Sequence, residues 1–178
     1  GKLKAEPLGI LLHITAGNVF LSAIDSLIQG FLTKNISLLK PASANRRFPE
    51  LVASAFLEAD QEGVLSDCFA ILQFQGGDER IENPLLAKVH GVIAWGGASS
   101  MESIKHRLPA GVRFLEFGPK ISVQVISQNY FHHTDTSSLA RQLAAEICLW
   151  DQAACASPQN LFLQSGIDPE GWMDKLAK

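Results

Sequence analysis

Short apolar runs alternate with amphipathic segments along most of this chain. Residues 8–14 form an almost continuous apolar run, which is typical of a strand covered on both faces. The next segment places Ile24, Leu27, Ile28 and Phe31 at helical spacing. The same alternation predicts further strands over residues 36–40, 67–74, 89–95, 112–116 and 121–127, and helices over 48–59, 79–88, 99–107 and 136–150. This order predicts an α/β fold, an open parallel Rossmann-like sheet with helices on both faces.

Several polar residues stand at the ends of the predicted strands or just after them. Open parallel sheets bind ligands at the carboxyl ends of their strands, near the point where the strand order reverses. The residues that we expect to meet at this edge are Asn18, Lys40, Gly97 and Glu116. The dinucleotide fingerprint Gly-x-Gly-x-x-Gly is absent, and Gly96-Gly97 alone fits a structural turn as well as a phosphate-facing loop.

Composition narrows the class of protein. With 178 residues, 47% hydrophobic and 19% charged, the chain suits one globular domain with a real core, and no Pro/Gly/Ser-rich linker divides it. A net charge of -3 gives no basic field, which disfavours nucleic acid as a partner. The longest apolar run is too short to span a bilayer, and the start resembles the middle of a longer protein rather than a secretory leader.

The chain has three cysteines, and their uneven spacing argues against a disulfide framework and for a reducing compartment, hence the cytoplasm. Cys68, beside a strand, and Cys148, within a helix, are expected in the core. Adjacent His132 and His133 point apart and lack an acidic ligand at metal spacing, so we expect a surface loop there and no metal site. His13 is expected to be a packed strand residue.

Residues 151–159 place Cys155 among small and polar residues directly after an amphipathic helix. A cysteine after a helix is more often a small buried hydrophobe than a reactive group. The flanking glutamine and the Ser157-Pro158-Gln159 segment favour instead a displayed, reactive thiol.

An ordered set of motifs resembles the aldehyde dehydrogenase superfamily. The motifs are Pro7-Leu8-Gly9, Gly17-Asn18-Val19, Leu39-Lys40-Pro41-Ala42-Ser43, Trp95-Gly96-Gly97, residues 115–120 and Gln152 with Cys155. Residues 13–18, the Trp-Gly-Gly turn and residues 151–159 are most similar to the acyl-CoA reductases, which include the fatty-acid reductase subunit of luminescent bacteria. The resemblance runs from Pro7 to about Phe162, and it rests on order and spacing more than on any single motif.

The resemblance implies a nicotinamide nucleotide on the sheet, bound without the usual glycine fingerprint. Lys40 matches the superfamily's ribose-binding lysine. Ser43 stands where NAD-preferring members commonly carry a glutamate, which favours NADPH over NADH, with Arg46 or Arg47 as further phosphate partners. A solvated surface is the alternative interpretation of Lys40 and the arginines. The remaining expected cofactor-binding residues are Thr15, Trp95, Gly96 and Gly97.

The resemblance also implies a reaction. Cys155 matches the nucleophile, whose thiolate attacks an acyl group to give an acyl-enzyme that hydride converts to an aldehyde. Asn18 matches the oxyanion-stabilising residue, and it can also cap the helix that follows. Glu116 matches the general base of aldehyde oxidation; in a net reduction, proton handling or orientation is the expected role. Pro119 replaces the glycine usual in the dehydrogenase motif, which leaves the direction of that loop open.

Two residues, Ala153 and Ala154, separate Gln152 from Cys155, where the dehydrogenases have one, and this favours the acyl-CoA reductase branch. Full enzymes of the family continue well past the nucleophile. We therefore expect residues 1–178 to be a nucleotide-binding domain that carries the nucleophile loop, without the remainder of the catalytic domain.

The favoured function is NADPH-dependent reduction of a long-chain acyl-CoA or acyl-protein thioester to an aldehyde. Two alternatives stay open: a non-catalytic domain that binds a nucleotide or a subunit, and an NAD(P)-dependent aldehyde dehydrogenase. The expected partners are the acyl donor, an acyl-transferring subunit and, in the full-length form, further copies of the chain.

Overall fold

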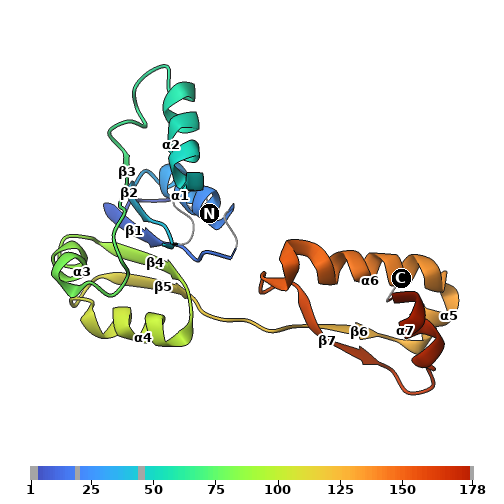
Figure 1. Cartoon of the computed structure of the whole chain (residues 1–178). Coiled ribbons are helices and arrows are strands. Elements are labelled where there is room, and N and C mark those ends of the chain that lie inside the picture. The colour runs from blue at the N-terminus through green and yellow to red at the C-terminus, as the bar shows by residue number, and fades with distance from the viewer. Residues whose placement is uncertain (1–3, 19–20, 44–46, 177–178) are drawn as a thin grey trace. The chain divides into compact units, whose positions relative to one another are not determined.

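The structure, a computed structural model, describes residues 4–18, 21–43 and 47–176. The chain packs as two compact units, Gly1–Gly118 and Pro119–Lys178 (Figure 1). The sequence pattern predicts one globular domain, whereas the chain forms two units. The packing differs because the strand at residues 122–126 pairs within the second unit and does not extend the first sheet.

The first unit contains a five-stranded parallel sheet. Its strands are β1 (Ile10–Ile14), β2 (Ile36–Lys40), β3 (Phe69–Ile71), β4 (Gly91–Trp95) and β5 (Arg113–Phe117). Their spatial order is β3-β2-β1-β4-β5, so the order reverses between β1 and β4. Ile14 pairs with both Lys40 and Ala94, which brings the carboxyl ends of the central strands to one edge. The predicted open parallel α/β sheet is confirmed.

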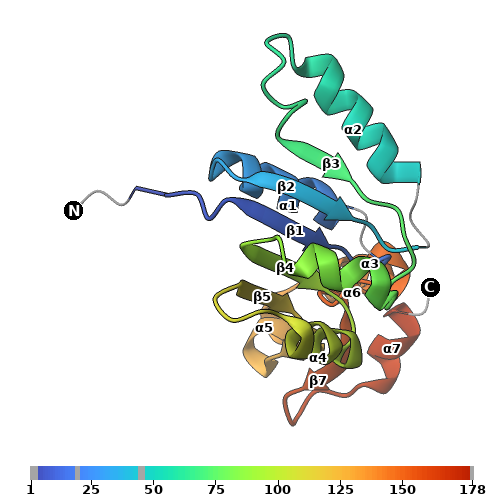
Figure 2. The same ribbon diagram turned by 90° about the vertical axis from the view of Figure 1, so that its left-hand side faces the viewer.

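Helices cover both faces of this sheet. They are α1 (Leu21–Leu32), α2 (Arg47–Ala59), α3 (Glu79–Leu86) and α4 (Ala98–Arg107). Helices α1 and α2 lie on one face and α3 and α4 on the other (Figures 1 and 2). Leu12 of β1 belongs to a buried cluster with Leu86 of α3 and Met101 of α4. On the opposite face, Leu39 of β2 clusters with Leu27 of α1, as strand alternation requires.

The second unit is smaller and has its own core. Its elements are β6 (Ser122–Ile126), α5 (Gln128–His133), α6 (Thr136–Cys148), the 3-10 turn η1 (Leu149–Gln152), β7 (Pro158–Leu163) and α7 (Glu170–Leu176). Strands β6 and β7 form a two-stranded parallel sheet. The core residues are Ile126, Leu139, Ala140, Leu143, Ile167 and Trp172. The two histidines expected in a loop instead form the last turn of α5 and are exposed.

Asp135 explains where α6 begins, because its carboxylate accepts from the amides of Ser137 and Ser138. The predicted helix over residues 136–150 ends early, at Cys148. No helix in the described ranges is long and apolar enough to cross a membrane.

Candidate active site

The carboxyl edge of the parallel sheet collects most of the residues singled out from the sequence. Thr15 follows β1, and its backbone amide donates to the carbonyl of Lys40 at 3.1 Å. Lys40 ends β2, and Gly96 and Gly97 join β4 to α4. Glu116 lies on β5, with its side chain exposed. Parallel strands therefore bring these positions to one edge, as expected.

Among the residues at this edge, Lys40 has the most enclosed side chain. The residue is only 6% exposed, and its ammonium lies 5.5 Å from the centre of the Phe74 ring. Burial lowers the pKa of Lys40, and the nearby carboxylate of Glu82 raises it. Within the described residues, no hydrogen bond or ion pair satisfies this ammonium. An ammonium that reaches a cavity from a mostly buried side chain, without a protein acceptor among those residues, is suited to an acceptor-rich ligand.

The Lys40 cavity, of about 270 Å³, opens at this edge. It is lined by Ile14, Lys40, Gly76, Gly77, Glu82, Ser99, Ser100, Ser103, Ile104 and Arg107. Gly97 is the N-cap of α4, makes no side-chain cap, and has nothing within 4 Å of the place where a Cβ would stand. The first amides of this helix are therefore open to an anion.

The other predicted cofactor residues lie around this cavity or outside it. Trp95 ends β4 and stacks on Phe117, with 4.7 Å between ring centres and 8° between planes. Ser43 is exposed and lines a separate cavity of about 110 Å³ beside Phe74. Arg47 begins α2 and is exposed, whereas Arg46 lies outside the described residues.

Asn18 is exposed in the bend after β1. Residues 19–20, which join it to α1, lie outside the described residues, so the helix-cap role expected of Asn18 stays a prediction.

The nucleophile loop lies in the second unit and is held mainly through its backbone. Cys155 is exposed, as expected, and its carbonyl accepts from the hydroxyl of Ser122 at 2.6 Å. Ala154, just before it, is buried. The buried hydroxyl of Ser157 donates to the Leu149 carbonyl at 3.0 Å, which closes the loop on itself. The backbone is fixed while the thiol remains open to solvent.

An unusual turn precedes this loop. Trp150, Asp151 and Gln152 have φ values of 59°, 50° and 57°, all left-handed. Such values are uncommon for residues other than glycine and cost about 1 kcal/mol or more each. The sequence shows no glycine here and gave no sign of the turn. Because the helix ends before it, Cys148 is exposed, and the expectation that it lies in the core is wrong; Cys68 is half-buried.

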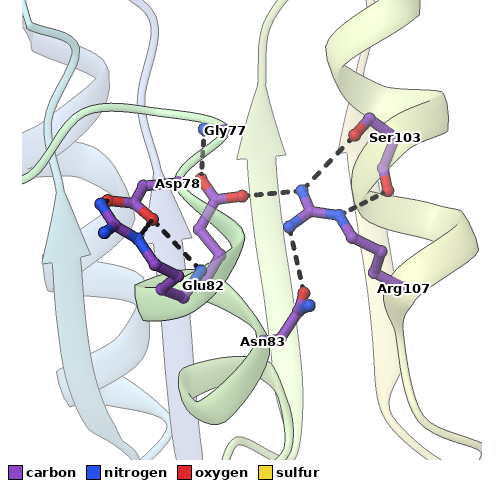
Figure 3. A network of polar contacts seen from close by, with 7 residues as sticks. Gly77, Asp78, Glu82, Asn83, Ser103 and Arg107 are labelled. Carbon is purple, nitrogen blue, oxygen red and sulfur yellow. Dashed lines mark hydrogen bonds and ion pairs between the residues drawn. The ribbon is translucent and has the colours of Figure 1, made fainter.

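Sequence reasoning also missed Glu82 and Arg107, which line the Lys40 cavity with their side chains joined at 2.7 Å (Figure 3). One signal was present. Glu82 precedes the buried Leu86 by four residues, so it lies on the inward stripe of α3. A carboxylate at such a position requires a charged or hydrogen-bonding partner.

The described residues include no group of three or more His, Cys, Asp or Glu side chains that could hold a metal ion. The candidate chemical groups are the thiol of Cys155 in the second unit and the Lys40 ammonium in the first.

Comparison with known proteins gives consistent results. The family model for acyl-CoA reductase (LuxC) matches residues 1–178. The long-chain acyl-protein thioester reductase of Vibrio harveyi is 32% identical over 178 residues, which are 99% of this chain and 36% of that protein. The protein of the same name from Photobacterium phosphoreum is 29% identical over 177 residues, 99% of this chain and 35% of that protein. The chain thus spans about a third of the length of these curated relatives.

Among solved structures, an NADP-dependent enzyme of E. coli superposes with a TM-score of 0.81 at 17% identity, covering 97% of this chain and 34% of that one. The aldehyde dehydrogenase KauB of Pseudomonas aeruginosa gives a TM-score of 0.81 at 18% identity, over 96% of this chain and 34% of that one. At such identities the likeness is one of fold, and the fold is that of aldehyde dehydrogenases.

Proposed function

Because this chain belongs to the acyl-CoA reductase (LuxC) family, we propose that it is the part of an enzyme that reduces a long-chain acyl thioester to the aldehyde. The observation that carries the proposal is the exposed thiol of Cys155 on a clamped backbone. Nucleophilic catalysis needs this combination of an accessible sulfur and a fixed attack position.

In the proposed reaction the Cys155 thiolate attacks the carbonyl carbon of the acyl thioester. A new sulfur–acyl bond forms, the bond to the donor's sulfur breaks, and the donor leaves as a thiol after taking a proton. A nicotinamide cofactor supplies the hydride when bound. Addition of this hydride and a proton to the acyl group releases the aldehyde and restores the thiol. The donor is an acyl-CoA or an acyl-protein, delivered in the second case by an acyl-transferring subunit.

Residues of the first unit fit the nucleotide. The buried, unpaired ammonium of Lys40 suits ribose oxygens, and the open amides that follow Gly97 suit the diphosphate. Thr15 follows β1 and Gly96 follows β4 at the same edge of the sheet, and Trp95, stacked on Phe117, ends β4. We propose NADPH as the cofactor, since the hydroxyl of Ser43 can donate to a 2′-phosphate that a carboxylate would repel.

Two side chains are assigned to the reacting group itself. Asn18 donates its amide to the oxyanion that forms when the thiolate adds to the carbonyl. Glu116 orients the acyl group or handles the proton; it does not activate water, because hydrolysis of the acyl-enzyme would waste the intermediate. The complete enzyme is proposed to be a homo-oligomer.

The decisive experiment is mass spectrometry of the complete protein after incubation with an acyl-CoA in the absence of reduced nucleotide. We expect one acyl group, on the peptide that contains Cys155, and its loss with release of aldehyde when NADPH is added. An acyl group on another residue, or an aldehyde product without any covalent intermediate, would contradict the proposal.

A further inference from the structure

The ion pair between Glu82 of α3 and Arg107 of α4 is largely removed from solvent. Its side chains are 10% and 16% exposed, and the two charged groups approach to 2.7 Å (Figure 3). The other carboxylate oxygen, Oε1, accepts from the backbone amide of Gly77 at 2.9 Å. Glu82 is therefore fixed from two sides, by a loop and by a neighbouring helix.

Each nitrogen of the Arg107 guanidinium contacts the protein. Its Nε donates to the carbonyl of Ser103 at 3.0 Å, and its Nη1 donates to the side-chain oxygen of Asn83 at 3.3 Å. Nη2 lies against Glu82. With these donors in use, Arg107 is held as a structural partner of Glu82 and is not presented to a ligand.

Lys40 is the third charged residue of the same cavity, and it differs from Arg107 in having no protein acceptor among the described residues. Gly76 keeps the space around it open, since a Cβ there would lie 3.2 Å from the Lys40 Nζ. Two cations and one anion face the cavity, so one positive charge is uncompensated. Because Arg107 already neutralises Glu82, that charge is the Lys40 ammonium.

We propose that Glu82 and Arg107 are positioning residues that set the charge of the Lys40 cavity: Arg107 restrains Glu82, and Glu82 keeps the Lys40 ammonium charged without capturing it in a salt bridge. The ammonium is thereby left free for an acceptor-rich group. This inference rests on the proposed function in one respect, that the ligand is a nicotinamide nucleotide, whose ribose hydroxyls or 2′-phosphate supply the acceptors.

The balance between the two partners explains why both are needed. A buried ammonium with no anion nearby tends to lose its proton, whereas an unrestrained carboxylate beside it would form a closed ion pair that a ligand must break. The charged groups that face Lys40 are Glu82 from α3 and Arg107 from α4. Ile14 of β1 and the serines of α4 that line the cavity carry no charge.

The test is titration of the complete protein with NADPH and with NADH, from neutral to alkaline pH. Affinity should fall where Lys40 loses its proton. Glu82→Gln should move this fall to lower pH, and Arg107→Gln should move it to higher pH while weakening binding at neutral pH, because Glu82 then pairs with Lys40. A displacement of about one pH unit each way changes the charged fraction, and so the affinity, about tenfold. The profile of the double variant should fall between those of Glu82→Gln and the unmodified protein, because it removes the repulsion from Arg107 but still leaves the buried Lys40 without an anion.

Comparison of the two nucleotides identifies the acceptor. If the 2′-phosphate is the group bound, the displacements appear with NADPH alone; if ribose hydroxyls are bound, they appear with both. Asp78→Asn is the matched control, because it removes a half-buried carboxylate from the N-cap of the same helix, outside the Lys40 cavity, and Asn still caps. It should leave the profile in place.

Displacements in the same direction for the two single variants, or none, with nucleotide still bound, would overturn the inference and leave the proposed function standing. Absence of binding in the unmodified protein would overturn both. If Glu82→Gln does not fold, the test still stands on two variants: affinity should fall at higher pH in Arg107→Gln than in the double variant.

Discussion

The Lys40 cavity and the Cys155 loop hold their reactive groups in opposite ways. Lys40 is 6% exposed, and charged neighbours set its state, whereas Cys155 is exposed and held by hydrogen bonds to its backbone and to its loop. The buried ionisable side chains of the described residues, His13, Lys40 and Glu82, all lie in the first unit. In the second unit the buried polar side chain of the described residues is Ser157, a neutral hydroxyl.

This difference separates two physical tasks. Binding an anionic or polyhydroxylated ligand benefits from charge in a low dielectric, where each interaction is stronger than in water. A nucleophile needs access to its substrate and a fixed position more than it needs burial. Variants that act on buried charge should therefore affect the first unit, and variants that act on backbone conformation should affect the second.

The largest effect is expected at the nucleophile. Cys155→Ala should abolish acylation while leaving nucleotide affinity within a few-fold, since the thiol makes the covalent bond and belongs to the other unit. Mass spectrometry and nucleotide titration measure the two properties. Cys148→Ser is the matched control, an exposed thiol seven positions away that should be replaceable without loss of acylation. Acylation that survived in the alanine variant would show that the wrong residue was assigned.

Much of the first unit could be predicted from the sequence because its strands are buried on both faces. Continuous apolar runs such as residues 8–14 carry a strong signal, and parallel pairing then requires the strand ends to meet. The second unit gave a weaker signal. Strand β7 begins with Pro158 and continues with two exposed polar residues, Gln159 and Asn160, and its apolar Phe162 is also exposed, so the sequence pattern predicts no strand there.

The candidate site could be predicted only where a residue follows directly from the strand pattern or the family motifs. Lys40 and Cys155 met that condition. Glu82 and Arg107 did not, because their pairing joins positions 25 residues apart on two helices, and no local pattern encodes such a contact. The left-handed turn at residues 150–152 could not be predicted for another reason: Asp151 tolerates positive φ, but Trp150 and Gln152 do not favour it, so tertiary packing must impose the conformation.

The next prediction concerns acid stability and sharpens the contrast between the units. Burial lowers the pKa of His13 from 6.5 to about 4, and its Nδ1 is hydrogen-bonded to Ser26. The unfolded chain therefore binds this proton more readily than the folded one. The contribution of neutral His13 to the free energy of unfolding should be fully present above pH 6.5. It should be lost as the pH falls from 6.5 toward 4, by about 3 kcal/mol at most.

Hydrogen exchange as a function of pH should show this loss in β1 and α1 and not in β6 and α6. His13→Gln should flatten the pH dependence of unfolding, and the exposed His132→Gln should not. Equal acid sensitivity in the two units would remove His13 as the cause.

The third prediction tests whether Lys40 contributes its charge to binding. Lys40→Met keeps the aliphatic stem beside Phe74 and removes the ammonium. Hydrogen bonds to charged groups contribute about 1.5–3 kcal/mol, so affinity for NADPH and NADH should fall about tenfold to a hundredfold. Lys88→Met, at an exposed position after α3, is the control and should change neither affinity. Fluorescence titration provides the measurement.

The fourth prediction concerns the choice of nucleotide. The unmodified protein should bind NADPH more tightly than NADH, and Ser43→Glu should reverse the preference because its carboxylate repels a 2′-phosphate. Competitive titration of the two nucleotides measures the ratio. A preference for NADH in the unmodified protein would refute the assignment of Ser43, without bearing on Lys40.

The smallest effect is expected in the left-handed turn at residues 150–152, where the free energy of unfolding should respond to backbone conformation alone. Gln152 is exposed with φ of 57°, so its side chain is not needed for the core. Gln152→Gly should raise the free energy of unfolding by about 0.5 kcal/mol, because relief of strain slightly exceeds the added entropy of the unfolded chain. Gln152→Val should lower it by about 1 kcal/mol, since a β-branched residue tolerates this conformation poorly.

Gln159→Val, in the extended backbone of β7, makes the same exchange at another exposed position and should be neutral or slightly stabilising. Denaturant unfolding measures all three variants, and equal effects of valine at the two positions would show that the turn stores no strain.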